Sequence, residues 1–491
     1  MAAKPICLRK ILLTLYIAFV LISQIYAFFD VKNALIMLLL LVVVAFVSFF
    51  ISNVVLHFLN KINFEYKVEN KKSDKKKYII NFIIVFVIGL ILYNLKIVTG
   101  KAMFEPDFYF AMQQAENNSY ATFSSPIFIL LFAKLPKTIF NNPFFISIFY
   151  VLVRSLIVSY IISELSFNIV MNILLIIFYC FFPLSIHSET TLLKDTPCAI
   201  FTAISILLIY KHYYSSKENY LYETLIAVFL ALAYFMRPNA VVFSSLMIIM
   251  LFIIYKKDRI KSYIRVLIVF IALLIVGNVV VPKCVRVTKN DPSFNKVEVM
   301  SIPASVIMAV AKEKPESLND KENDCLRVMC GENLEALETF DPKVGWESVK
   351  FNQSIYMRKN LPFSYLDLAY YTLDLLVKEP AIAIRQIIRS TSSLYGYRYI
   401  GKRRNSILSN VYYTFANIEI GVLFFILISL LIAKCSLFDE SRVNILLAIP
   451  IIVFSVITAL IIASPAITRY YLPLQMSVPI YAFYIIGYSK K

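Results

Sequence analysis

The sequence is poor in charged residues, in histidine and in glycine, and each shortage excludes a class of protein. Charged residues make up 16% of the chain and apolar residues 59%, whereas soluble domains have about 25% charged and about 45–50% apolar residues. Three histidines and no matching cysteine spacing exclude a typical zinc site. The glycine-rich fingerprint of a nucleotide-binding loop is also absent. The composition therefore excludes a protein that is soluble as a whole, no typical zinc site is present, and nothing in the sequence indicates a nucleotide-binding loop.

Long apolar segments take the place of the missing charge. A segment of about 20 residues crosses a hydrocarbon core of about 30 Å as a helix. We predict twelve spans, near 11–29, 34–58, 78–97, 143–164, 168–186, 196–214, 220–236, 239–255, 264–282, 413–433, 443–463 and 469–487. Region 120–140 is apolar but broken by Pro126 and Pro136, which predicts short or re-entrant helices. The predicted fold class is an all-α polytopic membrane protein with a mixed or helical external soluble segment.

Lysine and arginine gather in alternate loops, and this pattern orients the spans. The N-terminus and the loops "KINFEYKVENKKSDKKKY" and "YKKDRIKSYIR" carry clusters of them, and twelve spans put all three on one side. The positive-inside rule names that side cytoplasmic. The segments left outside are the first loop, "HSETTLLKD", "MRPNA", 283–412 and "ASPAITRYY". We therefore predict a multi-pass protein of the cell membrane, with its active site on the external face.

The net charge of +18 is then a topology signal and an attraction to anionic lipid. It does not indicate nucleic-acid binding, because the basic residues are dispersed among the spans instead of lining one soluble face. The first span follows a basic segment, as in a signal peptide. No small-residue cleavage site follows it, so we interpret it as a membrane anchor.

The spans divide the chain into three predicted parts. Residues 1–282 form a transmembrane catalytic module with the first external loop at 98–142, residues 283–412 an external soluble domain, and residues 413–491 the C-terminal transmembrane helices. In the external domain, Pro380 should end one helix or begin the next. Cys325 and Cys330 lie where oxidation is possible, and both a local disulfide and two free thiols stay open.

Two acids stand just outside the third span, in "FEPDFYFAMQQA". Apolar neighbours would raise the pKa of Glu105 or Asp107 and suit that carboxylate to accept a proton. Alternatively, the acids only complement the dipole of a helix that begins near Pro106.

The segment "HSETTLLKDTP" places four ionisable residues between two apolar stretches. Asp195 is expected to cap the helix that follows, whose first N–H groups then point outward. Such a helix end binds phosphate readily, and Lys194 adds a full positive charge. His187 and Glu189 lie upstream and would face an acceptor or water. The simpler interpretation is a solvated loop.

Two arginines stand at the predicted outer boundary of the membrane. Arg237 lies in "FMRPNA" between two spans, and Arg469 lies in "SPAITRYYLP" before the last span. An arginine at membrane depth costs about 2.5–3.5 kcal/mol on insertion scales, so it tends to have a partner or a task. Reaching up to lipid headgroups is the alternative. Together with Lys194, the two arginines predict a site for a lipid-linked phosphate or pyrophosphate.

This arrangement resembles the GT-C class of integral-membrane glycosyltransferases, of the protein O-mannosyltransferase and lipid A aminoarabinose transferase type. The motifs that carry the resemblance are "EPDFYFAMQQ" followed by "SSP", "LLKDTP" at an external helix start, "MRPN" after a later span, and a soluble segment before the last spans. The resemblance covers most of 78–282 in pattern. Two departures are that Pro106 splits acids often adjacent in the family, and that "SSP" replaces a His before Pro.

The resemblance implies a glycosyltransferase that uses a polyprenyl-phosphate-linked sugar donor and a glycan, lipid or protein acceptor on the external face. Asp107, or less surely Glu105, would be the general base at the acceptor. Lys194 and Arg237, with Arg469, would stabilise the leaving phosphate. No cofactor is certain, and a divalent metal is compatible with the pattern.

Two other functions stay open. A polysaccharide polymerase or ligase of the O-antigen-ligase kind would use lipid-diphosphate donors and arginines of the large loop, and "YGYRYIGKRRN" agrees with it. A lipid-linked sugar transporter or flippase would need polar residues in mid-span and helices broken by glycine or proline. Only nine glycines are present, although Arg154 lies within a span.

Overall fold

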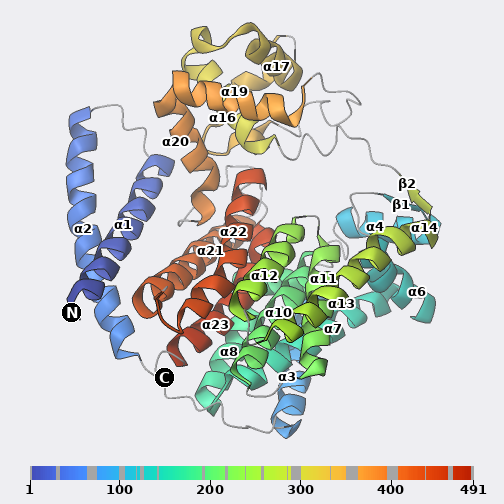
Figure 1. Ribbon diagram of the computed structural model, residues 1–491. Coiled ribbons are helices and arrows are strands. Elements are labelled where there is room, and N and C mark those ends of the chain that lie inside the picture. Colours follow the sequence, from blue (N-terminus) through green and yellow to red (C-terminus); the bar gives the residue numbers. More distant parts are fainter. Residues whose placement is uncertain are drawn as a thin grey trace. The chain divides into compact units, whose positions relative to one another are not determined.

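The computed structural model is helical almost throughout (Figure 1). It describes residues 3–28, 34–62, 75–98, 106–117, 119–121, 126–140, 143–190, 194–215, 219–237, 239–255, 259–284, 286–288, 300–331, 333–349, 363–394, 407–436, 438–462 and 468–487. The chain forms two compact units. Unit 1 contains 1–61, 290–433 and 455–468, and unit 2 contains 62–289, 434–454 and 469–491. The first two helices thus group with the stretch after 290, whereas the predicted three-part division follows the order of the chain.

Seven helical segments of the described chain are long and apolar enough to cross a membrane: Leu8–Ile25, Leu38–Lys61, Lys75–Asn94, Ser147–Leu165, Ile260–Cys284, Thr414–Lys434 and Arg442–Leu460. Shorter apolar helices are α8 (Ile169–Phe181), α11 (Tyr220–Met236), α12 (Ala240–Tyr255) and α23 (Leu472–Gly487). The multi-pass, all-helical class is therefore confirmed, and the count of twelve spans stays a prediction.

One predicted span is wrong in its continuity. Segment 168–186 is two helices, α8 and α9 (Pro183–Thr190), separated at Phe182. Phe182 has an extended backbone, with φ −66° and ψ 151°, because the ring of a following proline disfavours the helical conformation in the residue before it.

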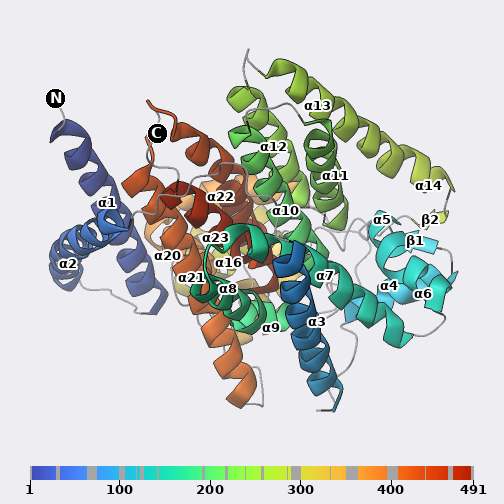
Figure 2. The same cartoon turned by 90° about the horizontal axis from the view of Figure 1, so that it is seen from below.

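Unit 2 is a helical bundle centred on α10 (Asp195–Tyr214), which packs against α7 (Pro143–Leu165), α11 and α23. α3 (Lys75–Val98) packs on α7, and α11 packs on α13 (Ile260–Ile275). From α13 the chain runs on through η2 (Val276–Val280) and α14 (Val281–Cys284). The stretch 120–140 contains α5 (Pro126–Ile129), η1 (Leu130–Lys134) and α6 (Leu135–Phe140), which follow one another as one uninterrupted helical run. Pro126 begins this run, but Pro136 lies within it and does not break it, contrary to the prediction. Figure 2 shows the bundle from below.

Amide side chains join three helices of this bundle. Asn81 of α3 and Asn172 of α8 exchange two side-chain hydrogen bonds, at 3.0 and 2.8 Å. Ser163 of α7 accepts from Asn81 at 2.8 Å, and Ser166 donates to Asn172 at 2.9 Å. Hydrogen bonds between polar side chains hold helices together in an apolar medium, where hydrophobic burial gives little.

Two of the segments predicted to be external meet in unit 2. β1 (Ser119–Ala121), in the first loop, pairs in parallel with β2 (Arg286–Thr288), at the start of 283–412. The two strands lie next to α4 (Pro106–Asn117) and α14 in Figure 1. The pairing joins the strand that follows α4 to the strand that follows α14.

The loops predicted to be cytoplasmic also contact one another. Lys77, at the start of α3, donates to the carbonyl groups of Ser163 and Ser166 at 3.1 and 2.5 Å. Arg259, before α13, donates to the carbonyl of Ser215, after α10, at 2.6 Å. These contacts join segments that the charge pattern predicts to lie on one side. The charge rule alone assigns the cytoplasmic side.

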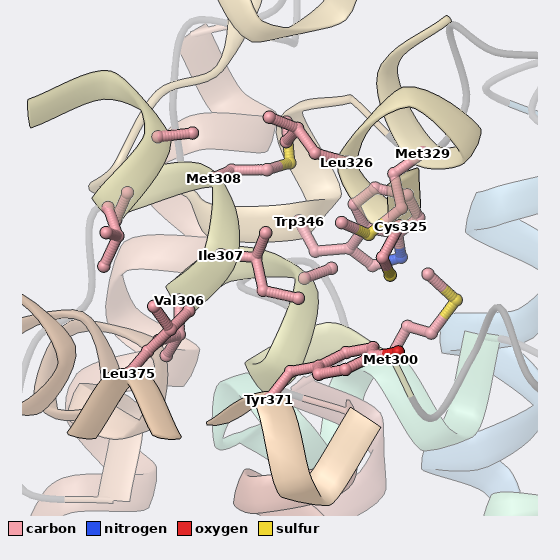
Figure 3. Close-up of a cluster of buried hydrophobic side chains, with 14 of the residues drawn as sticks. Met300, Val306, Ile307, Met308, Cys325, Leu326, Met329, Trp346, Tyr371 and Leu375 are labelled. Atoms are coloured by element: carbon pink, nitrogen blue, oxygen red, sulfur yellow. The ribbon is translucent and has the colours of Figure 1, made fainter. Parts of the chain in front are cut away.

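Unit 1 contains a small helical domain with its own core (Figure 3). Its helices are α16 (Ser301–Glu313), α17 (Asp320–Cys330), α18 (Glu335–Thr339), α19 (Tyr365–Lys378) and α20 (Pro380–Thr391), with 3-10 turns η3 (Pro315–Ser317), η4 (Gly345–Ser348) and η6 (Ser392–Leu394). Pro380 begins α20, as predicted. The core surrounds Trp346, which is fully buried. Cys325 and Cys330 are free thiols within this core.

A glycine and a serine fix the position of Trp346. Gly345 has φ +74°, a left-handed conformation that costs little only for glycine. The turn lets the backbone N–H of Trp346 donate to the Ser305 hydroxyl of α16 at 2.7 Å. A side chain at position 345 would also meet this hydroxyl, 2.8 Å from where its Cβ would stand.

The remaining helices of unit 1 are α1 (Ala3–Phe28), α2 (Ala34–Lys61) and α21 (Ile407–Lys434), whose last residue belongs to unit 2. α22 (Arg442–Ile462) is divided between the units. Thr14 of α1 and Ser52 of α2 share a hydrogen bond of 2.8 Å, and Tyr16 stacks on Phe425 of α21 with ring centroids 5.9 Å apart. α1 also packs against α20.

Candidate functional site

The start of α10 and the end of α11 meet because the two helices are antiparallel neighbours of similar length. α10 has 20 residues and α11 has 17, which correspond to about 30 and 26 Å of helix. Only 215–219 separates them. The chain therefore returns to its starting level, and Asp195 at the start of α10 faces Arg237 at the end of α11.

Asp195 was predicted to cap α10, and this prediction is wrong. Asp195 is instead the first residue of the helix. Lys194 occupies the N-cap position, and its side chain makes no capping hydrogen bond. The Asp195 carboxylate instead forms an ion pair with the Arg237 guanidinium. α10 begins one residue earlier than expected, and Asp195 is only 1% exposed.

Arg237 is fixed on two sides. Besides its ion pair with Asp195, its guanidinium lies over the ring of Tyr470, 3.7 Å from the ring centroid. Tyr470 belongs to η7 (Thr468–Tyr471), the turn before α23. With 7% of its surface exposed, Arg237 is held inside unit 2 and does not reach out to lipid headgroups. The alternative that gave this arginine a partner is the one that the structure supports.

The end of α11 at this point follows from the sequence. Arg237 is the C-cap of α11, with φ −144° and ψ 140°, and the next residue in the chain is Pro238. A proline disfavours the helical conformation in the residue before it. Packing also sets the position of the end of α11, because the ring of Phe235 fills the place where a side chain at Gly277 of η2 would stand.

Among the described residues of this site, the charges of Asp195 and Arg237 offset each other. Lys194, at the N-cap position of α10, carries a further positive charge. The N-terminus of α10 adds a partial positive charge. Pro197, the third helical residue, has no N–H to offer. The backbone at this helix start therefore offers one donor fewer to an anion.

The other predicted site residues are placed only by their helices. Asp107 lies in α4, and His187 and Glu189 lie in α9, but their side chains are outside the described residues. The same holds for the side chain of Arg469, in η7, and for the whole of Glu105.

Packing ties two of these helices to the elements of the ion pair. α4 packs on α5, and α5 contacts α11, the helix that ends at Arg237. Gln475 of α23 donates to Ser185 of α9 at 2.7 Å, which attaches the helix of His187 and Glu189 to α23. The motifs of the first loop, of "LLKDTP", of "MRPN" and of "TRYY" thus belong to elements that pack on one another.

Neither Tyr470 nor the pairing of Asp195 with Arg237 was predicted from the sequence. A signal for the pair was present, because two oppositely charged residues stood at the same predicted membrane boundary on consecutive spans. Tyr470 follows Arg469 directly, but an aromatic residue at a span end is a common interfacial anchor, and nothing marked it as the partner of an arginine.

A second buried polar cluster lies at the opposite ends of α10 and α11. The Nδ1 atom of His212 lies 2.7 Å from the hydroxyl oxygen of Tyr255, and its Nε2 atom lies 3.4 Å from a carboxylate oxygen of Glu223. Arg265 of α13 donates to both carboxylate oxygens of Glu223, the longer bond being 2.8 Å. This cluster joins α10, α11, α12 and α13, so we interpret it as structural.

Arg154 lies within a predicted span, and this position favoured the alternative function of a transporter. It is 1% exposed and donates to the carbonyl of Tyr179 at 2.5 Å. Tyr179 lies in the last turn of α8, where a cation complements the negative end of the helix dipole. The contact joins α7 to α8, and this gives Arg154 a structural role.

Among the residues that the structure describes, no group of three or more His, Cys, Asp or Glu side chains is placed to hold a metal ion. Comparison of the chain with protein-family models, with curated proteins and with solved structures gave no match.

Proposed function

We propose that the chain is a membrane glycosyltransferase that moves a sugar from a polyprenyl-phosphate-linked donor to a cell-envelope acceptor on the external face. The observation that supports it best is the meeting of "LLKDTP", "MRPN" and "TRYY" in one cluster, where Asp195 and Tyr470 fix Arg237 beside the start of α10. A fixed guanidinium next to a lysine and a helix N-terminus suits a phosphate group.

In the proposed reaction, an acceptor hydroxyl oxygen attacks the anomeric carbon of the sugar. The bond from that carbon to the phosphate oxygen breaks, and the polyprenyl phosphate leaves with the electron pair. Asp107 of α4 takes the proton of the hydroxyl group, and Lys194 and Arg237, with Arg469, stabilise the charge on the phosphate. A single displacement inverts the configuration at the sugar carbon.

The ion pair predicts whether each substitution will strengthen or weaken the binding of a phosphate. Because Asp195 offsets the charge of Arg237, replacing Asp195 by Asn adds one positive charge at the site. Replacing Arg237 by Met has the opposite effect, because it removes the guanidinium and leaves a carboxylate where an anion should bind. We therefore expect Asp195→Asn to bind a polyprenyl phosphate more tightly than the wild type, and Arg237→Met to bind it more weakly than Lys194→Ala does.

The experiment measures binding of a short-chain polyprenyl phosphate to the full chain in nanodiscs, with the matching uncharged polyprenol as control. A charge-assisted hydrogen bond contributes about 1.5–3 kcal/mol, so Lys194→Ala should weaken phosphate binding about tenfold or more. Polyprenol binding should not change. Equal losses for both lipids, or no loss for either, would remove the phosphate site from the proposal.

The chemical step has a separate test. Asp107→Asn should lower sugar transfer and leave polyprenyl-phosphate binding nearly unchanged, because a general base acts in the transition state and not on the bound lipid. Transfer is measured with polyprenyl-phosphate sugars as donors and envelope extracts as acceptors. A normal rate in Asp107→Asn would place the base elsewhere. Transfer only from diphosphate donors would favour the polymerase or ligase alternative.

The external face is part of the proposal and is tested in cells. Single cysteines at positions 119 and 73, in a chain without its native cysteines, are exposed to a membrane-impermeant thiol reagent in intact cells. Position 119 should be labelled, and position 73 should react only after the cells are opened. Labelling of both positions from outside would contradict the proposed orientation.

A further inference from the structure

α19 carries a stripe of large apolar side chains on its outer face. Leu366, Tyr370, Leu373 and Val377 are between 62% and 82% exposed. Their spacing of four, three and four residues places them along one side of a helix. Isolated exposed apolar residues are common on protein surfaces, but a continuous stripe of them indicates a surface that binds something.

The core of the domain fixes which face of α19 is outside. Leu368, Tyr371 and Leu375 point into the core around Trp346, and Figure 3 shows Tyr371 and Leu375 within this cluster. A capping box at Ser364 and Asp367 sets where the helix begins, with hydrogen bonds of 3.2 and 2.6 Å. The stripe therefore cannot turn inward without emptying the core.

The helix that follows α19 contacts a candidate membrane-spanning segment of unit 1. α20, which follows α19 directly, packs against α1, and Gln24 donates to the carbonyl of Ser392 of η6 at 3.4 Å. Gln24 lies near the end of the candidate span Leu8–Ile25. The chain from α19 through α20 to η6 thus leads to the boundary of the bilayer that α1 would cross.

The direction of α19 suits a membrane surface. α2 runs along the vertical axis of Figure 1 and is seen nearly end-on in Figure 2, whereas α19 lies across that axis in Figure 1. All three helices, α1, α2 and α19, belong to unit 1. If α2 crosses the bilayer, α19 is roughly parallel to its plane.

We propose that α19 is an interfacial helix that lays its stripe into the outer surface of the lipid bilayer and so holds the helical domain against the membrane. Such helices bury their apolar face about 5–10 Å into the boundary between headgroups and acyl chains. Tyr370 suits this layer because its ring is apolar and its hydroxyl can stay hydrated. Ile384 of α20 is exposed as well.

Tryptophan fluorescence in the full chain tests the proposal. The sole native tryptophan, Trp346, is buried and serves as an internal reference. A second tryptophan is introduced in the stripe by Leu373→Trp or, in a separate variant, by Val377→Trp. The control is Asp324→Trp, at an exposed position of α17. Each variant is placed in nanodiscs of ordinary phosphatidylcholine or of phosphatidylcholine brominated in the upper acyl chain, because bromine quenches tryptophan only at close range.

We expect brominated lipid to remove most of the added emission of Leu373→Trp and Val377→Trp, and to leave that of Asp324→Trp and Trp346 unchanged. Two results would overturn the proposal. Emission from the stripe that is insensitive to bromine but quenched by aqueous acrylamide would show a stripe in water. Emission protected from both quenchers would show that protein covers the stripe, either another part of this chain or a second copy.

Discussion

The buried ion pair of Asp195 and Arg237 makes a strong prediction about stability. Removing one member of such a pair leaves the other charge buried and costs about 3–5 kcal/mol, whereas removing both is often nearly neutral. Asp195 is 1% and Arg237 7% exposed, so this estimate for buried pairs applies. We expect Asp195→Asn and Arg237→Met each to lower the free energy of unfolding by about 3–5 kcal/mol.

The double variant Asp195→Asn with Arg237→Met measures how strongly the two residues depend on each other for stability. It keeps a buried amide at position 195, which costs about 1–3 kcal/mol, but it contains no unpaired charge. We expect its loss of stability to be smaller than either single loss, with a coupling of more than about 2 kcal/mol. The assay is equilibrium unfolding by SDS in mixed micelles, followed by circular dichroism. Losses that add within about 0.5 kcal/mol would refute the argument.

The contact of Arg237 with the ring of Tyr470 can be tested with a matched pair of substitutions at position 470. A cation over an aromatic ring contributes about 0.5–1 kcal/mol at exposed sites and about 2 kcal/mol when desolvated, and Tyr470 is half-buried. Tyr470→Leu should therefore lower stability by about 1 kcal/mol, and Tyr470→Phe should lose much less because it keeps the ring. In an Arg237→Met background, Leu and Phe at position 470 should be nearly equal in stability. A difference that persists there would show that Tyr470 acts through other contacts.

Three further predictions concern the rest of the chain. Burial raises the pKa of Glu322 above its ordinary value near 4.5, and a hydrogen bond with Asp374 acts in the same direction. The folded chain thus keeps a proton that the unfolded chain releases, and stability falls as pH rises from about 4.5 through the higher folded pKa. Glu322→Gln should lack this fall in unfolding measured across pH, and an unchanged pH profile would contradict it. Gly345→Ala should lower stability by about 1–3 kcal/mol, because alanine is strained at positive φ, and should expose Trp346 to acrylamide; wild-type quenching would count against this. Glu223→Gln leaves Arg265 facing a neutral amide, so it should lower the SDS concentration at the unfolding midpoint. The same substitution in a chain that already carries Arg265→Met should lower that midpoint less.

The sequence by itself determined the multi-pass helical class and the positions of the long apolar helices. These features follow from local composition: apolar runs of membrane length form helices because no water is available to their backbone groups. The Pro380 boundary was predictable for a similar reason, because the restriction that proline imposes is local. The charge pattern of the loops likewise predicted one side for the segments that Lys77 and Arg259 join.

Only the tertiary structure showed which side chains contact one another. Asp195 was expected to cap its own helix because the motif "LLKDTP" suits a cap. It pairs with Arg237 because α10 and α11 are antiparallel and of similar length, a relation between residues 42 positions apart. The sequence "YLDLAYYTLDLLVK" is apolar around much of α19, so its pattern could not tell which face would be exposed. The core around Trp346 took Leu368, Tyr371 and Leu375, and close packing of a core fixes the orientation of a helix that composition leaves open.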